Sequence, residues 1–271
     1  MMPIHSPMAS VDTLETKMSL PNEPSTKRTT RIVLPAFNEE KDLGHLLERI
    51  EEAMYEIRLP YELVIVDDGS SDDTPGVIAR WAKTMPIRSI RHEVNQGLGV
   101  TIRDGLRLAC ELSDPRDVIV TLDADNSHTP ELILRLVRLI REGHDVVIAS
   151  RFRPGSSVRG VPLSRRFLSR VAGLLFRVTF PIKGVRDYTC GYRAYRAGVL
   201  QKVTSDDPTF FDQSGFQVMV DILLKLRRDK DLVFGEAPLI LRYDLKRGAS
   251  KMDIGDTIAA TLKLMVRRRF E

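Results

Sequence analysis

Two carboxylates follow an apolar run near the middle of the chain. The run IVTL at 119–122 is typical of a buried strand, and Asp123 and Asp125 come directly after it. Alternate residues of a strand share one face, so both side chains can converge beyond the strand end. Converging carboxylates repel each other and are costly to desolvate unless a cation lies between them. The pair therefore predicts a divalent metal that also binds a diphosphate, or a solvated loop in which one acid caps the next helix.

These acids need a scaffold, and the hydrophobic pattern predicts alternating strands and helices from about residue 31. Such alternation favours an α/β fold with a doubly wound, mostly parallel sheet and helices on both faces. The expected strands are 31–36, 62–67, 87–91, 118–122, 145–149 and 233–242. The expected helices are 39–55, 74–84, 98–112 and 130–142, followed by amphipathic segments at 161–180 and 215–226.

Three of the expected strands end in polar groups. They are PAFNE at 35–39, DDGS at 67–70 and DAD at 123–125. The carboxylates of the second could accept from a ribose or a base, although an Asp-Gly turn followed by a helix cap explains the same residues. The glycines of NQGLG at 95–99 would allow a phosphate to approach a helix start, or would serve a packing turn. Because ligands of such sheets bind beyond the strand ends, the three ends predict one crevice.

Positive charge is concentrated in one block. Residues 151–196 hold ten arginines and one lysine against a single acid, Asp187, although the formal charge of the chain is only +4. The block predicts an anionic partner. It has no aromatic platform, zinc signature or helix-turn-helix, which argues against nucleic acid. Arginines interleaved with large apolar residues at 161–180 suit a helix at a lipid headgroup surface better than a merely solvated face, and arginine also binds phosphate in bidentate fashion.

Composition limits the compartment, the membrane topology and the domain organisation that the chain can have. The 271 residues include two cysteines without metal spacing, which suits a reducing compartment, and no uncharged apolar run is long enough to span a membrane. Residues 1–30 are rich in Ser, Thr, Pro and Met, and we expect a disordered tail rather than a signal peptide. We expect one domain at 31–252, in which the pattern changes after about residue 150, and a basic helix at 253–271.

Several motifs occur in a fixed order. They are PAFNEE, VIVDDGSSDDT, NQGLGVTIRDGL, TLDADNSHTPE, IASRF, DYTCGYRAY and RGASKM. In this order they resemble the inverting family 2 glycosyltransferases, most closely the dolichol-phosphate mannosyltransferase branch and its bacterial polyprenyl-phosphate relatives. The resemblance runs from about residue 31 to 251 and implies an A-type glycosyltransferase, Rossmann-like domain. It further implies that residues 31–252 form the catalytic domain, with a nucleotide-sugar half (31–150) and an acceptor half (151–252).

The resemblance also implies roles for matching positions. Nucleotide contacts are implied for Pro35, Phe37, Glu39, Asp68 and Asp123. Ligation of Mg²⁺ or Mn²⁺ is implied for Asp123 and Asp125. The sugar and acceptor side is implied for Asp187, Thr189, Gly191 and Arg193, and the expected catalytic residues are Asp125, Asp187 and Arg193. Binding of the lipid phosphate is implied for Arg151, Arg165, Arg166, Ser169 and Arg170. A loop that closes over the donor is implied for Arg247, Ser250 and Lys251.

The sequence departs from the family pattern at three places. Ser127 stands where some relatives have a glutamine near the metal, so it is not assigned as a ligand. Asp221 stands where many relatives have a glutamate, and its role stays open. Leu245 replaces a basic loop residue, for which Lys246 or Arg247 would have to compensate. The membrane spans of some relatives are also missing, so we expect peripheral association, with room for a membrane-anchoring partner protein.

The expected function is transfer of a hexose from a nucleotide-sugar donor, GDP-mannose favoured, to a polyprenyl phosphate at the cytoplasmic face of a membrane. A phosphate acceptor is already ionised near pH 7, so no strong general base is needed, and His128 is interpreted as structural. Three alternatives stay open: a transferase for a soluble or protein acceptor, a nucleotidyltransferase, and a non-enzymatic membrane-associated scaffold. The acidic PAFNEE segment argues against the nucleotidyltransferase, which usually has a basic glycine-rich loop there.

Overall fold

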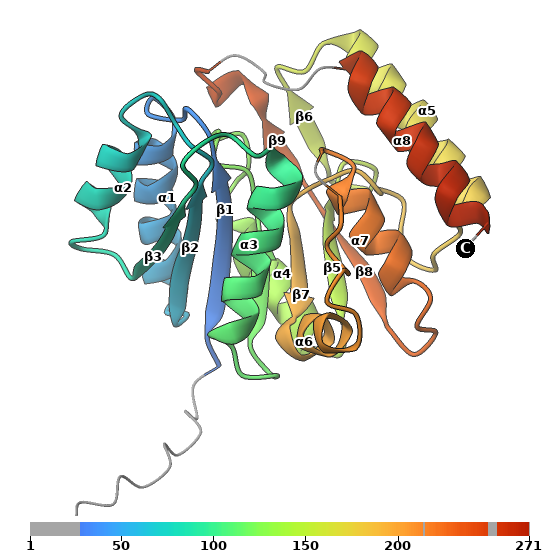
Figure 1. Cartoon of the computed structure of the whole chain (residues 1–271), viewed down its shortest axis with the longest axis horizontal. Helices are drawn as coiled ribbons and strands as arrows, with labels where there is room; N and C mark the ends of the chain where they lie inside the picture. The colour runs from blue at the N-terminus through green and yellow to red at the C-terminus, as the bar shows by residue number, and fades with distance from the viewer. Residues whose placement is uncertain (1–27, 214, 249–253, 271) are drawn as a thin grey trace, which may run out of the picture.

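The computed structural model describes residues 28–213, 215–248 and 254–270. A seven-stranded sheet forms its centre (Figure 1). The strand order is β3 (Ile87–Arg91), β2 (Tyr61–Asp67), β1 (Thr30–Ala36), β4 (Val118–Thr121), β7 (Arg193–Arg196), β5 (Val146–Ser150) and β8 (Phe234–Pro238). All pairs are parallel except those of β7, which runs antiparallel to β4 and β5. The mostly parallel α/β sheet expected from the alternation is therefore confirmed.

Helices cover both faces of this sheet (Figure 1). Contacts link α3 (Leu98–Glu111) to α6 (Ala197–Asp206) and α7 (Val218–Leu226) on one face. On the other face α1 (Leu43–Ile57) packs on α2 (Thr74–Trp81), and hydrogen bonds from Arg49 of α1 reach the start of α4 (Leu132–Arg141). Helix α4 packs its apolar face on the fully buried strand β5. The buried residues of this face recur at helical spacing: Ile133, Leu136, Val137 and Ile140.

Two further helices lie side by side beyond the sheet (Figure 1). They are α5 (Leu163–Thr179) and α8 (Ile254–Phe270), the second of which falls within the predicted basic helix at 253–271. A small parallel pair, β6 (Ser157–Arg159) and β9 (Ile240–Arg242), leads into the 3₁₀ helix η1 (Tyr243–Leu245). Within the described residues, no helix has the length and apolar character needed to cross a bilayer. The predicted tail at 1–30 falls mostly outside the described residues.

Four elements differ from expectation. The expected strand 233–242 is divided at Leu239, and its two parts, β8 and β9, join different sheets. Strand β7 and helix α6 were not expected. Helix α1 begins at Leu43 rather than at residue 39, because the chain first forms a turn in which the amide of Asp42 donates to the carbonyl of Glu39 (3.1 Å).

Candidate functional site

A cavity of about 470 Å³ opens at the carboxyl ends of β1, β2 and β4. The three polar strand ends predicted to form one crevice do meet there. The predicted site residues that line it are Pro35, Phe37, Glu39, Asp68, Asp123, Asp125, Arg151, Thr189 and Gly191. The described part of the chain holds no group of three or more His, Cys, Asp or Glu side chains that could bind a metal without further ligands. Any metal here would need ligand oxygens beyond the acid pair.

Asp125 is the buried member of the acid pair, only 8% exposed. Its Oδ1 accepts hydrogen bonds from the hydroxyl (2.6 Å) and the amide (3.1 Å) of Ser127, and its Oδ2 accepts from Lys246 Nζ (2.7 Å). Burial raises the pKa of Asp125, but the Lys246 ammonium more than offsets this, so the pKa lies below its ordinary value. The carboxylate is therefore ionised at neutral pH. Ser127 orients the carboxylate, and Lys246, which the sequence suggested only as one of two replacements for a basic loop residue, neutralises it.

Asp123 is half-exposed at the cavity wall, and His128 fixes the backbone beside it. The amide of Asp123 donates to His128 Nδ1 (3.2 Å), which assigns the proton of the neutral ring to Nε2. His128 Nε2 lies 3.8 Å from Asp123 Oδ2, and the ring packs on Tyr192 at 5.0 Å between centroids. His128 is thus a buried support of the acid pair that also lines the cavity.

Asp68 holds the loop that precedes α3. Its Oδ1 accepts from His92 Nδ1 (2.7 Å) and the amide of Gln96 (2.9 Å), and its Oδ2 accepts from the amide of Gly97 (2.9 Å). Gly97 has a positive φ of 90°, which a residue with a side chain rarely adopts. Asp68 lines the cavity, and its carboxylate fixes the loop that forms one wall. A contact between this carboxylate and a nucleotide stays a prediction.

Arg151 stands between this cavity and a second one, and lines both. Its Nε and Nη2 bind the carboxylate of Asp187 (2.8 and 2.7 Å), and Nη2 also donates to Thr189 Oγ1 (2.6 Å). Asp187 is fully buried; burial raises its pKa, but Arg151 outweighs this and holds the pKa below its ordinary value. The expected catalytic residue Asp187 lines neither cavity, and acts on them through Arg151.

The structure does not bring Arg193 to either cavity. Its guanidinium is fully buried and donates to the carbonyl oxygens of Tyr188, Cys190 and Met219. Three backbone carbonyls thus accept from this side chain, so its geometry is that of a residue that holds segments of the chain together. The sequence could not show this, because the partners of a buried guanidinium depend on tertiary packing.

The second cavity has a volume of about 920 Å³ and lies between α5, α7 and α8. We call it the acceptor groove. The predicted phosphate-binding residues Arg166, Ser169 and Arg170 line it together with Arg151, among many apolar side chains. The side chain of Arg165 lies outside the described part, as do Ser250 and Lys251. Arg247 is described, and its amide donates to both carboxylate oxygens of Asp42 (3.1 Å each).

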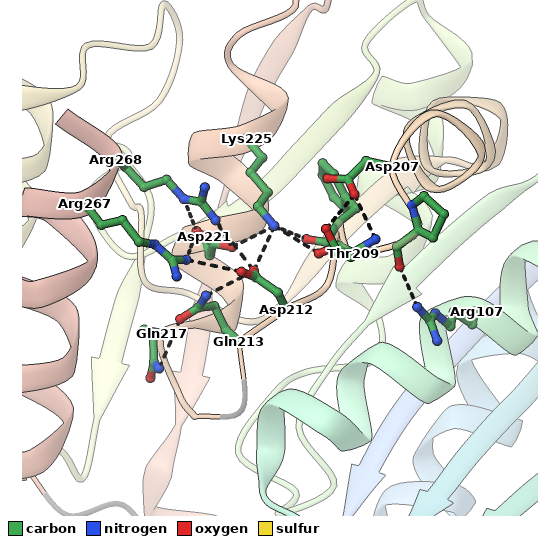
Figure 2. Close-up of polar contacts among 12 residues, drawn as sticks. Arg107, Asp207, Thr209, Asp212, Gln213, Gln217, Asp221, Lys225, Arg267 and Arg268 are labelled. Carbon is green, nitrogen blue, oxygen red and sulfur yellow. Dashed lines mark hydrogen bonds and ion pairs between the residues drawn. The ribbon is translucent and has the colours of Figure 1, made fainter. Parts of the chain in front are cut away.

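A cluster of ion pairs fixes α8 as one wall of the acceptor groove (Figure 2). Arg268 binds the buried carboxylate of Asp221 on α7 through Nε (2.7 Å) and Nη2 (3.0 Å). Lys225 Nζ lies 3.3 Å from Asp221 and 2.8 Å from Asp212, which also pairs with Arg267 (3.4 Å). A buried charge without a partner is costly, so α8 and α7 hold each other in place. Asp221, whose role the sequence left open, therefore anchors the C-terminal helix.

Comparisons with known proteins agree with this architecture. The family model described as "Glycosyl transferase family 2" matches residues 31–204. A dolichol-phosphate mannosyltransferase of Pyrococcus furiosus is 31% identical over 237 residues, 87% of this chain and 62% of that protein. A polyprenol monophosphomannose synthase of Mycolicibacterium smegmatis is 33% identical over 218 residues, 76% of this chain and 78% of that protein. The chain thus spans less than two thirds of the Pyrococcus relative.

Solved structures share the fold at low sequence identity. The glucosyl-3-phosphoglycerate synthase of Mycobacterium tuberculosis, solved with Mn²⁺, UDP and phosphoglyceric acid, matches with a TM-score of 0.60 at 22% identity and covers 89% of this chain and 77% of its own. Its complex with Mn²⁺ and UDP-glucose gives 0.62 at 22% identity, with coverages of 88% and 79%. The family match over more than half of the sequence, with two relatives above 30% identity, shows that this chain belongs to glycosyl transferase family 2.

Proposed function

We propose that the protein transfers a hexose from a nucleoside diphosphate sugar, GDP-mannose favoured, to a polyprenyl phosphate at the cytoplasmic face of a membrane. One observation carries the proposal: the acid-lined cavity and the apolar, arginine-lined acceptor groove adjoin at Arg151. Such a pair of sites suits a charged sugar nucleotide on one side and a lipid phosphate on the other. The names of the two curated relatives support the same substrate classes.

On the donor side, Asp123 and Asp125 would hold Mg²⁺ or Mn²⁺. The donor set fits, because Mg²⁺ takes one or two carboxylates and completes its shell with phosphate oxygens. Asp125 Oδ2 already attracts a cation, the Lys246 ammonium at 2.7 Å. When bound, the ion would supply Lewis acidity and neutralise charge on the leaving diphosphate. The Mn²⁺ and UDP in the complex of the Mycobacterium tuberculosis synthase support this part of the proposal.

On the acceptor side, Arg151 would position the lipid phosphate. Its Nε and Nη2 are taken by Asp187 and Thr189, whereas Nη1 has no hydrogen-bond partner among the described residues. The acceptor oxygen is ionised near pH 7, so orientation rather than proton removal is what the enzyme must provide. Arg166 and Arg170 add positive charge to the same groove.

The outer surface of α5 supports an encounter with a membrane. Apolar residues on it are exposed at helical spacing and form a stripe: Leu163 (78%), Phe167 (69%), Val171 (47%), Leu174 (60%) and Val178 (74%). A continuous apolar stripe of this kind is unusual on a surface that faces only water. Flanked by arginines, it has the pattern of a helix that lies in the headgroup region.

Replacing Phe167 and Leu174 together with glutamate is expected to weaken binding to vesicles of anionic phospholipid about 100-fold. Burying each side chain contributes about 1.5–3 kcal/mol, so losing both removes at least about 3 kcal/mol. Co-sedimentation would measure the effect, with Tyr55→Glu as the control, because Tyr55 is equally exposed but lies on the distant helix α1. Unchanged binding in the double variant would show that the stripe does not contact lipid.

A panel of nucleotide sugars and acceptors tests the activity itself. We expect radiolabelled sugar from GDP-mannose to enter the organic phase with a short polyprenyl phosphate and Mn²⁺, and transfer to stop with EDTA. A labelled product that stays in water when a soluble acceptor is offered would favour the soluble-acceptor alternative. Release of pyrophosphate instead of a nucleoside diphosphate would indicate a nucleotidyltransferase, and no turnover with any pair would favour a scaffold.

A further inference from the structure

Lys246 lies where a metal bound to the acid pair would lie. Its Nζ is 2.7 Å from Asp125 Oδ2, both side chains are nearly buried, and the ammonium is 5.7 Å from the centroid of the Tyr243 ring. The other oxygen of Asp125 is occupied by two hydrogen bonds from Ser127. Oδ2 is therefore the oxygen that a metal would use, and it is the one that Lys246 holds.

The segment that carries Lys246 is fastened to the start of α1. The buried carboxylate of Asp42 caps no amide of its own helix and instead accepts from the amides of Arg247 (3.1 Å) and Gly248 (2.9 Å). The guanidinium of Arg247 also lies 2.9 Å from His45 Nε2. These contacts fix the two residues that follow Lys246 and so help to hold its ammonium against Asp125.

An ammonium and a divalent ion compete for this oxygen. A metal–oxygen bond of about 2.0–2.1 Å would bring the ion to within a few ångströms of Nζ, where like charges repel strongly. Binding of a bare ion must therefore break the Lys246–Asp125 pair and bring additional positive charge into the cavity that Lys246 lines. An ion that arrives with a diphosphate brings compensating negative charge.

We propose that the ammonium of Lys246 occupies the place of the metal and excludes free metal from the acid pair, so that metal binds only together with the nucleotide. The inference rests on the proposed function, in which Asp123 and Asp125 hold the ion. It defines Lys246 as a positioning residue for that step and Asp42 as its support.

Mn²⁺ titrated into the full chain without nucleotide, followed by electron paramagnetic resonance of the free ion, tests this. We expect Lys246→Met to bind Mn²⁺ at least about tenfold more tightly than the wild type, because the competing charge is gone. Lys246→Arg should stay like the wild type. Lys202→Met is the matched control and should not change, since Lys202 is an exposed residue of α6. Asp42→Ala, which frees the segment but keeps the lysine, should shift affinity in the same direction as Lys246→Met.

The same titration with added GDP or UDP distinguishes a failure of this inference from a failure of the proposed function. If the wild type binds free Mn²⁺ as tightly as Lys246→Met, the inference is overturned while metal-dependent transfer stands. If no variant binds Mn²⁺ even with either nucleotide, the metal step of the proposed function fails first. Wild-type binding that appears only with a nucleoside diphosphate, beside nucleotide-independent binding by Lys246→Met, supports the inference.

Discussion

Asp125→Asn is expected to lower turnover at least about 1,000-fold while the protein stays folded. Asparagine has nearly the same shape but carries no charge, so it cannot balance a divalent ion at the place where Lys246 now sits. Loss of one group that stabilises the charge of a transition state typically costs about 100- to 1,000-fold, and loss of a metal ligand removes the ion as well. Initial rates with donor, polyprenyl phosphate and Mn²⁺ would measure the effect, with circular dichroism as the check on folding.

Asp206→Asn is the matched control, because Asp206 is an exposed acid at the end of α6, and no residue of α6 lines the cavity. It should leave the rate within about twofold. Turnover of Asp125→Asn within tenfold of the wild type, in a folded protein, would contradict the assignment of the acid pair.

The donor half of the fold follows from local patterns. Strands β1, β2 and β4 consist largely of buried β-branched and aliphatic residues, whereas β3 (IRSIR) is a half-exposed strand; each of the four was expected within one or two residues of its observed bounds. Because a parallel sheet places its carboxyl ends together, the convergence of Glu39, Asp68 and Asp125 followed directly from their positions after strands.

The acceptor half depended on contacts that sequence patterns do not encode. Strand β7, four residues long, is a strand because it inserts between β4 and β5, where it completes the hydrogen bonds of both. The strand is divided at Leu239 because the two polar groups of this residue bind different sheets. Its amide donates to the carbonyl of Ser150, next to β8, whereas its carbonyl accepts from the amide of Ser157 in the second sheet. Neither event leaves a periodic signal.

The sequence also did not predict the long-range ion pairs. Lys246 is 121 residues from Asp125, and Arg268 is 47 from Asp221. The family resemblance placed a basic residue near the loop but not its partner. Arg193 shows the reverse case: the family resemblance implied a catalytic role, which stays a prediction, whereas in the fold its guanidinium donates to three backbone carbonyls.

Arg151→Lys is expected to lower kcat/KM for the polyprenyl phosphate at least about 100-fold and to leave nucleotide affinity within about threefold. Lysine keeps the positive charge, but one ammonium cannot replace the two parallel bonds to Asp187, the bond to Thr189 and the remaining donor Nη1. An acceptor phosphate displaced by about 1 Å loses roughly 100-fold in rate. The acid pair is untouched, so the donor should bind as before.

Arg177→Lys is the control for Arg151→Lys, since Arg177 is an exposed arginine in the last turn of α5 that does not line the acceptor groove. Separate titrations of nucleotide and lipid phosphate, with steady-state kinetics for each substrate, distinguish the outcomes.

Chemical denaturation should also show that Arg151→Lys lowers the free energy of unfolding by about 1–3 kcal/mol, because Asp187 is fully buried and loses part of its hydrogen bonding. Equal losses for donor and acceptor would mean that Arg151 serves the common wall of the two cavities rather than the lipid phosphate, and the acceptor side would have to be sought elsewhere along the groove.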